Sequence, residues 1–343
     1  MNTVQRHFLL LITSITLGGF CSGPLAGTYA TGGSNYAWYK VEGASCIREP
    51  YGVIANFNTQ SSVIKQQLAA MRANGQQRLR IPIFYGHNLN TGTVMNSTGG
   101  NLSAQNRKNL ADFLKAVKNA GFVEIIVSFF PTGDYNDPAA WLSYKEENYQ
   151  ENWNVVFNVR PIIAASGMLY RIDLHNEAIP TSSQTALLQY TQHLWNDYVY
   201  SYGKNDTVGF SINTDTTQDR LDQLSIVYGD SIYGNHGAPY LFDLHIYGLE
   251  PKTQKNTFQI FQNAYNKIHP YFPGQGWIIG ETSYNDFEEA QDLNLAITAT
   301  GQIVFYVAQW PLTTSTFAQQ PPTNCRDVEL IPTSYDNYLS SGL

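Results

Sequence analysis

Two glutamates follow apolar runs of this chain, where a catalytic carboxylate of a parallel barrel would stand. Glu177 follows the run 169–174, and Glu281 follows the run 277–280. A carboxylate is costly in a closed core but ordinary at the open end of such a barrel, where active sites lie. Cleavage of a glycosidic bond needs one carboxyl group as proton donor and a second beside the anomeric carbon. The two glutamates, 104 residues apart, are therefore a candidate catalytic pair.

Other side chains suited to this chemistry fall at further expected strand ends. Arg80 lies within an apolar strand, and its guanidinium could keep a carboxylate nucleophile ionised. Asn176 precedes the first glutamate and could bind a sugar hydroxyl. His245 and Tyr247 alternate with a period of two, so both can face the same side of a strand.

A tryptophan and a histidine complete the candidate set. Trp310 ends the last expected strand and could form the floor of a sugar site, and His87 lies in a loop where it could contact substrate. Each of these residues also has a plain structural interpretation. Trp310 could be core, His87 solvent-exposed, and His245 a buried histidine with satisfied hydrogen bonds. Glu177 could interact with a helix dipole, and Glu281 could be an ion-pair partner of Arg80 without a catalytic role.

Strand-like and helix-like segments alternate from about residue 52 onward. The pattern predicts strands at 52–57, 79–84, 123–130, 169–175, 208–212, 240–246, 277–280 and 303–309. It predicts helices at 61–74, 105–120, 147–165, 184–202, 217–228, 257–268 and 286–300, with Pro161 kinking or shortening the third. Such alternation indicates a parallel sheet, and we expect an α/β fold, a single-domain (β/α)₈ TIM barrel over 31–343. A doubly wound open sheet is the rival, but no glycine-rich phosphate loop follows the first strand.

Composition and motifs narrow the possible partners. Charged residues make up 14% of the chain and aromatic residues 13%, which is unlike a disordered chain or a coiled coil but suits a carbohydrate cleft. A net charge of −7 argues against a nucleic-acid partner. The chain lacks the spacing of a histidine or cysteine metal motif, so we expect no cofactor and no catalytic metal. We expect a monomer whose partner is its carbohydrate substrate.

The N-terminus resembles an export signal. Arg6 precedes an apolar stretch, small residues follow, and cleavage is expected after Ala30, so that residues 1–30 form the signal peptide. An uncleaved anchor is the alternative, although the stretch is short for a membrane span. We expect a secreted or periplasmic protein without a membrane span in the mature chain. In an oxidising compartment Cys46 and Cys325 could form a disulfide, and two unpaired thiols are the alternative.

The ordered strand-end residues carry a family resemblance. Arg80-Ile81-Pro82, Asn176-Glu177, His245-Ile246-Tyr247, Glu281 and Trp310 resemble the cellulase-like clan of retaining glycosidases, and most closely glycoside hydrolase family 5. The resemblance implies that Glu177 is the acid/base and Glu281 the nucleophile. The chain departs from the family pattern at three places. Ala178 stands where proline is usual, and Thr282-Ser283 follow the second glutamate. The third strand ends with Ser128-Phe129-Phe130-Pro131, where the family often places a histidine. A neighbouring family of the clan, including biofilm-polysaccharide hydrolases, stays open.

These observations lead to one functional expectation and two alternatives. We expect an exported retaining hydrolase that cleaves O-glycosidic, β-type bonds of a polysaccharide or oligosaccharide. Its mechanism requires a pKa of Glu177 raised by burial or by the neighbouring charge, and an ionised Glu281. A non-catalytic carbohydrate-binding barrel in exopolysaccharide handling would need the aromatic cleft without the carboxylate pair. A transglycosylase would use the same pair with a sugar acceptor in place of water.

Overall fold

The structure is a computed structural model that describes residues 30–41, 49–214, 219–248, 256–311 and 333–343. Residues 1–29 of the expected signal peptide lie outside the described residues. The predicted disulfide between Cys46 and Cys325 lies outside them as well.

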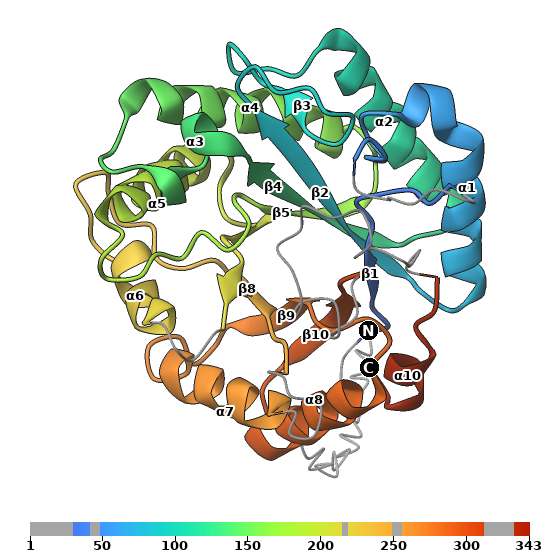
Figure 1. Cartoon of the computed structure of the whole chain (residues 1–343). Helices are drawn as coiled ribbons and strands as arrows, with labels where there is room; N and C mark the ends of the chain where they lie inside the picture. The colour runs from blue at the N-terminus through green and yellow to red at the C-terminus, as the bar shows by residue number, and fades with distance from the viewer. Residues whose placement is uncertain (1–29, 42–48, 215–218, 249–255, 312–332) are drawn as a thin grey trace, which may run out of the picture.

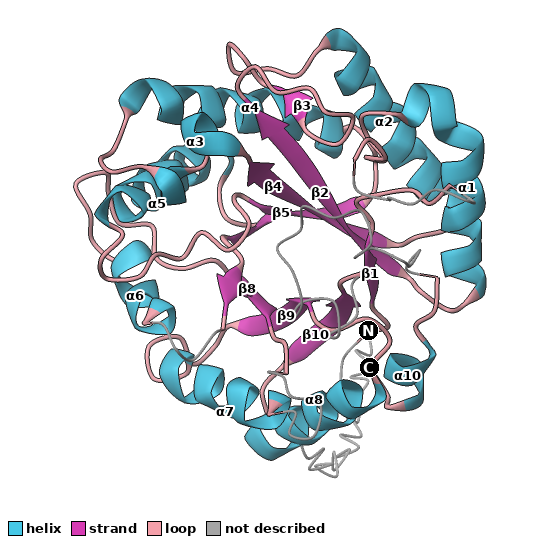
Figure 2. Ribbon diagram, in the orientation of Figure 1, coloured by secondary structure: helices cyan, strands magenta, loops and turns pink. Residues whose placement is uncertain are grey.

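Parallel strands form a ring inside a circle of helices (Figures 1 and 2). The ring consists of β1 (Gly33–Asn35), β2 (Arg78–Gly86), β4 (Glu124–Pro131), β5 (Leu169–Asp173), β6 (Thr207–Gly209), β7 (Ile212–Asn213), β8 (Leu241–His245), β9 (Gly276–Glu281) and β10 (Val304–Gln309). A short β3 (Met95–Asn96) pairs with the end of β2. All these pairings are parallel, so the carboxyl ends of the strands meet at one mouth.

The strand order closes the barrel through a broken fifth strand. The sheet runs β6-β5-β4-β2-β1-β10-β9-β8-β7. Its two end strands, β6 and β7, are separated in the chain by Phe210 and Ser211 alone, so together they stand where one continuous fifth strand was predicted. β6 pairs with β5 and β7 with β8. The expected (β/α)₈ barrel is confirmed, with this one strand in two pieces.

Helices cover the outside of the ring, and the longer ones pack apolar side chains into the core. They are α1 (Phe57–Ala73), α2 (Ala104–Ala120), α3 (Gly133–Asn136), α4 (Glu146–Ala164), α5 (Thr185–Tyr202), α6 (Arg220–Val227), α7 (Thr257–Ile268), α8 (Phe287–Thr300) and α10 (Asp336–Ser340), with a 3₁₀ turn at Pro138–Ala140. Local signals fix several ends: the Ser103 hydroxyl caps α2, and Gly121 ends it in the left-handed conformation. α4 continues through Pro161, so this proline does not shorten the helix as one sequence interpretation predicted.

The predicted first strand is wrong. Residues 52–57 form a bridge from Gly52 to Trp38 and a turn into α1, whereas the first strand of the barrel is β1. The apolar side chains of Val53, Ile54 and Phe57 made this segment resemble a strand, but they pack into the core from the turn. β1 is short and polar because its side chains bond inside the barrel, so it has no apolar pattern.

The C-terminal segment seals the barrel wall between its first and last helices. Thr333 accepts hydrogen bonds from Asn74 and Gln76 at the end of α1. The Tyr335 hydroxyl donates to the carbonyl of Val307 on β10 at 2.7 Å. α10 therefore lies beside α8 and close to the chain segment that enters β1 (Figure 1).

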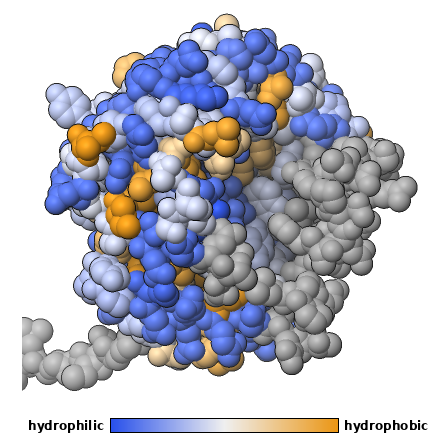
Figure 3. All heavy atoms as spheres, turned by 60° about the vertical axis from the view of Figure 1, so that its left-hand side comes forward, coloured by the Kyte–Doolittle hydropathy of each residue, from blue (hydrophilic) through white to orange (hydrophobic). Residues whose placement is uncertain are grey.

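The described surface carries no continuous apolar belt on the face shown in Figure 3. This face is mostly hydrophilic, and its hydrophobic side chains form small, separate groups. Among the described helices, none has both the length and the apolar character needed to cross a membrane.

Candidate active site

A single buried arginine connects most strands at the barrel mouth. Arg80 of β2 is fully buried, and its Nη1 donates to Glu281 Oε1 at 2.6 Å. Its Nη2 donates to Asn176 Oδ1 at 2.7 Å and to Asp173 Oδ2 at 2.8 Å, and its Nε donates to Asp243 Oδ2 at 3.3 Å. Burial alone would lower the pKa of Arg80, but the surrounding carboxylates, with Glu281 first, raise it above its ordinary value. The guanidinium thus stays charged and joins residues from β2, β5, β8 and β9.

Glu281 stands at the end of β9, as its sequence position predicted, and is 6% exposed. Besides the bond from Arg80 it accepts a hydrogen bond from the Tyr247 hydroxyl at Oε2, at 2.8 Å. Burial and the charge of Glu281 raise the pKa of Tyr247 well above its ordinary value, so the phenol keeps its proton and remains a donor. The carboxylate is therefore fixed by a cation on one oxygen and a phenol on the other, as a positioned nucleophile requires.

The loop after Glu281 is fixed by a buried carboxylate that the sequence interpretation missed. The hydroxyls of Thr282 and Ser283 both donate to Glu289 of α8, each at 2.7 Å. Glu289 is fully buried and also accepts hydrogen bonds from the backbone N–H of Gly248. The two hydroxyl residues that depart from the family pattern thus anchor the strand end to the following helix.

Glu177 lies in a left-handed turn just after β5, with a φ of +52°. A non-glycine residue in this region is uncommon and is held there by its surroundings. Its backbone N–H donates to Ser211 Oγ at 2.8 Å. A proline at 178 would push the preceding residue toward extended conformations, so Ala178 is compatible with this turn where the proline of the family pattern is not.

The carboxylate of Glu177 is held by two side chains and remains partly accessible. Nδ1 of His245 lies 2.9 Å from its Oε1, and Nδ2 of Asn213 donates to its Oε2 at 3.0 Å. The same His245 Nδ1 lies 3.5 Å from Glu281 Oε2. The Glu177 side chain is 32% exposed and that of His245 is fully buried, so the imidazole sits beneath the pair, between the two carboxylates. The sequence interpretation placed Glu177, His245 and Glu281 at one mouth, and the structure brings His245 into contact with both carboxylates.

The protonation pattern of the pair differs from the sequence-based expectation. Burial would raise the pKa of Glu177, but the hydrogen bond and charge of His245, with the Asn213 amide, lower it below its ordinary value. Burial would lower the pKa of His245, but Glu281 and Glu177 raise it. Burial raises the pKa of Glu281, against the opposing charges of His245 and Arg80. The pKa of Glu177 is therefore lowered, not raised as expected, because the contacts with His245 and Asn213 favour the carboxylate form over burial.

The geometry also bears on metal binding. Glu177, His245 and Glu281 each offer one ligand atom, and these atoms lie within 4.8 Å of one another. A divalent cation would find three suitable donors there. The present contacts already satisfy them, because His245 Nδ1 is hydrogen-bonded to a carboxylate and Arg80 neutralises Glu281. The arrangement is therefore explained by proton sharing and ion pairing.

An aromatic wall adjoins the charged centre. Trp310, 7% exposed, contacts Trp38 edge to face at 5.8 Å and lies nearly parallel to Phe130, 6.5 Å away. Phe130 packs on Phe84 at 4.8 Å, and the Arg80 guanidinium lies 5.6 Å from its ring centroid. Phe130, at the strand end where the family often has a histidine, thus extends the wall and packs against the buried arginine. The predicted placement of Trp310 near the site is consistent with this cluster.

His87 belongs to a different cluster of contacts. Its Nδ1 lies 2.8 Å from Oε2 of Glu151 on α4, and its ring stacks on Tyr135 at 4.0 Å. Glu151 is held in turn by Ser97 and Asn136. The structure therefore places His87 at the loops after β2 and β4, with hydrogen-bond and stacking partners other than the two glutamates.

Several functional-site residues escaped the sequence interpretation: Asn35, Ser128, Asp173, Ser211, Asn213, Asp243 and Glu289. Asp173, Ser211 and Asp243 are fully buried polar residues. A weak signal existed for the aspartates, because each interrupts an apolar strand with a charge. Asn213 and Ser211 gave no such signal, since their strand is short and its neighbours are known only after folding.

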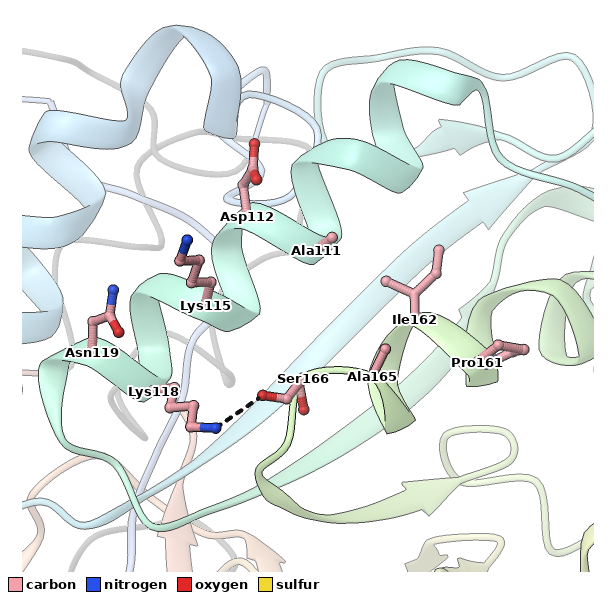
Figure 4. Close-up of a pocket in the computed structure, with 9 residues that line it drawn as sticks. All are labelled: Ala111, Asp112, Lys115, Lys118, Asn119, Pro161, Ile162, Ala165 and Ser166. Atoms are coloured by element: carbon pink, nitrogen blue, oxygen red, sulfur yellow. Dashed lines mark hydrogen bonds between the residues drawn. The ribbon is translucent and has the colours of Figure 1, made fainter.

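A surface cavity lined by described residues lies away from the candidate site. This cavity of about 730 Å³ lies on the outer surface between α2 and α4, lined by Lys115, Lys118, Pro161 and Ile162 among others (Figure 4). Lys118 donates there to the carbonyls of Ser166 and Gly167 after α4. This cavity is a groove between neighbouring helices, and the Lys118 side chain stabilises the end of α4.

Solved structures share the barrel. An exo-beta-1,4-mannosidase from Opitutaceae bacterium strain TAV5 is 12% identical, with a TM-score of 0.56 over 83% of this chain and 52% of that one, so the chain spans about half of that protein's length. A beta-glycosidase from Pyrococcus horikoshii is 11% identical, with a TM-score of 0.53 over 94% and 98% of the two chains. A GH5 family lichenase from Caldicellulosiruptor sp. F32 is 12% identical, with a TM-score of 0.50 over 81% and 84%. No protein-family model matches the chain, and no curated protein is similar to it in sequence. At these identities the likeness shows the fold, and the chain shares the (β/α)₈ architecture of these glycosidases.

Proposed function

We propose that the protein is an exported retaining glycoside hydrolase that acts on β-linked polysaccharide or oligosaccharide. The observation that carries this proposal is the proximity of Glu177 and Glu281. One carboxylate oxygen of each and a ring nitrogen of His245 all lie within 4.8 Å of one another. Retaining enzymes separate their carboxyl groups by about 5–5.5 Å, whereas inverting enzymes leave about 6.5–9.5 Å for a water molecule. The proteins of similar fold include an exo-beta-1,4-mannosidase and a GH5 family lichenase, and this supports the class.

In the first step Glu281 would attack the anomeric carbon while the bond to the leaving oxygen breaks. The leaving oxygen takes a proton from Glu177. This proton would pass along the 2.9 Å contact from His245, whose pKa is raised by the charges of Glu281 and Glu177 against the effect of burial. Glu177 and His245 therefore act as one proton-sharing pair whose titration belongs to both groups.

In the second step the glycosyl ester on Glu281 is hydrolysed with net retention. Glu177, now deprotonated, takes a proton from water as the water oxygen bonds to the anomeric carbon, and the ester bond breaks to release Glu281. The lowered pKa of Glu177 favours the base form that this step needs. The Arg80 guanidinium and the Tyr247 phenol stabilise the carboxylate that leaves.

The roles of the two glutamates can be separated chemically. We expect Glu281→Gln to abolish turnover with the fold intact. With a β-glycoside that carries a 2,4-dinitrophenyl leaving group, azide should restore activity to both alanine variants. Glu177→Ala should yield the β-glycosyl azide and Glu281→Ala the α-anomer, because azide replaces water in one case and the nucleophile in the other.

The products are read by NMR of the anomeric proton, after a screen of mannan, mixed-linkage glucan, xylan and bacterial exopolysaccharides. Near-wild-type activity of Glu281→Gln would refute the nucleophile role. Glycan binding without release of reducing ends would instead identify a carbohydrate-binding barrel. Sugar transfer that dominates at high oligosaccharide concentration would identify a transglycosylase.

A further inference from the structure

The broken fifth strand of the barrel lies directly beside Glu177. β6 ends at Gly209 and β7 begins at Ile212, and the two pieces pair with different neighbours. Breaks and bulges of this kind redirect side chains and are frequent next to active sites. The side chains of Ser211 and Asn213, which follow the break, both reach Glu177.

Specific contacts hold the break open. Gly209 has a φ of +70°, and a Cβ atom there would lie 2.3 Å from the hydroxyl oxygen of Tyr228. That hydroxyl accepts a hydrogen bond from the Phe210 N–H at 3.1 Å. The Ser211 N–H donates to Asp173 Oδ1 at 2.9 Å. Side chains thus replace the ladder partners that a continuous strand would give these two amides.

Asn213 and His245 together contact both oxygens of the Glu177 carboxylate. The two contacts differ in charge and in the number of carboxylates that each side chain can reach. His245 Nδ1 is 2.9 Å from Glu177 Oε1 and 3.5 Å from Glu281 Oε2, so it can turn from one carboxylate to the other as charge moves between them. The Asn213 amide carries no charge and donates to Oε2 at 3.0 Å. It can keep this bond while Oε1 gives up or takes a proton.

We propose that Asn213, placed by the break in the fifth strand, is a positioning residue that holds Oε2 of Glu177 and leaves Oε1 for proton transfer. This inference rests on the proposed function and adds a residue to its machinery. The amide donor stabilises the carboxylate form of Glu177 over the acid form. Removal of the donor therefore raises the pKa of Glu177 and frees the side chain to rotate.

The test is a carboxyl titration that needs no substrate. The full chain is labelled with [5-¹³C]glutamate, the Glu177 signal is assigned by its loss in Glu177→Gln, and its chemical shift is followed against pH. In Asn213→Ala the midpoint of this signal should move to higher pH. In Asn213→Asp, which keeps the shape but adds a second negative charge, it should move further in the same direction.

Thr191→Val is the matched control for loss of one buried side-chain hydrogen bond away from the break. Thr191 of α5 is fully buried, and its hydroxyl donates to the Leu188 carbonyl at 2.9 Å. This variant should leave the Glu177 midpoint unchanged. An unchanged midpoint in both folded Asn213 variants would overturn the proposal, as would an equal shift in Thr191→Val. Activity of Glu177→Gln separately tests the proposed function, so the two ideas can fail independently.

Discussion

At the scale of single residues, the site is built around a buried excess of negative charge. Arg80 is surrounded by Asp173, Asp243 and Glu281, all within hydrogen-bond or ion-pair distance. Asp243 is the member least well compensated, because its Oδ1 has no hydrogen-bond partner among the described residues. Burial raises the pKa of Asp243 to about 6, against the opposing charges of Arg80 and His245.

This raised pKa predicts a pH dependence of stability. The folded protein retains the Asp243 proton up to pH about 6, whereas the unfolded chain loses it near 3.8. The unfolded state therefore binds fewer protons between these values, and the free energy of unfolding falls as pH rises through this window. Asp243→Asn should flatten this fall, as measured by urea unfolding between pH 4 and pH 8.

The control for this experiment is Asp222→Asn, which removes an exposed carboxylate that pairs with Lys267. The free energy of unfolding should fall more steeply with pH in the wild type than in Asp243→Asn. The control variant should show the same slope as the wild type. Parallel curves for the wild type and Asp243→Asn would contradict the assignment.

Much of the residue-level chemistry was predictable because it depends on residue type and strand-end position. Arg80 and Tyr247 both donate to Glu281, and these are the two contacts that the sequence predicted. The protonation of Glu177 was not predictable, since it depends on His245 and Asn213, which lie 68 and 36 residues away in the chain. A pKa reports the sum of burial and neighbouring charges, and both arise only on folding.

At the scale of elements, this barrel differs from the family pattern mainly at the ends of its strands and in the turns that follow them. The three departures from the family pattern each have a local physical role. Ala178 permits the left-handed turn at Glu177, Phe130 extends the aromatic wall, and Thr282 with Ser283 binds the buried Glu289. Each of these residues supports a side chain of the candidate site or the backbone beside it.

The break in the fifth strand predicts an effect of one hydroxyl group. Tyr228→Phe would leave the Phe210 N–H without its acceptor, which should cost about 1–3 kcal/mol of unfolding free energy. Urea unfolding measures this loss. Tyr306→Phe is the matched control, because the Tyr306 hydroxyl is buried without a hydrogen-bond partner in the described part of the chain. A loss in the control as large as that in Tyr228→Phe would argue against the role of this hydrogen bond.

The sequence predicted elements best where a continuous apolar pattern exists. The predicted and observed bounds of α7 coincide at 257–268. β1 was missed because Ser34 and Asn35 bond to Gln76 and Arg80 inside the barrel, so the strand lacks an apolar pattern. The interruption of the fifth strand was missed because its partners, Tyr228 and Asp173, belong to other elements.

At the scale of the whole molecule, closure of the barrel depends on segments far apart in the chain. β1 pairs with both β2 and β10, and the segment 333–343 bonds to the ends of α1 and β10. The first and last parts of the barrel therefore stabilise one another. This mutual support keeps β9 and β10, with Glu281 and the start of the aromatic wall, aligned with β2.

Loss of this closure should be costly. Tyr335 is fully buried and stacks on Tyr338 at 5.2 Å. Tyr335→Ala should lower the unfolding free energy by about 3–5 kcal/mol, because it leaves a cavity and a carbonyl without its donor. Leu339→Ala, at a side chain 37% exposed in the same segment, should cost far less. Thermal and urea unfolding of both variants test this, and equal losses would show that the segment does not seal the barrel through Tyr335.

The sequence by itself determined the alternation of strands and helices, the (β/α)₈ class and the strand-end positions of Glu177, Glu281, Arg80 and Tyr247. Those features follow from local periodicity and residue type, which are written along the chain. Only the tertiary structure decided which strand opens the barrel, where the fifth strand breaks and which side chains hydrogen-bond the two glutamates. These depend on contacts between residues far apart in sequence, whose burial and charge exist only once the ring has closed.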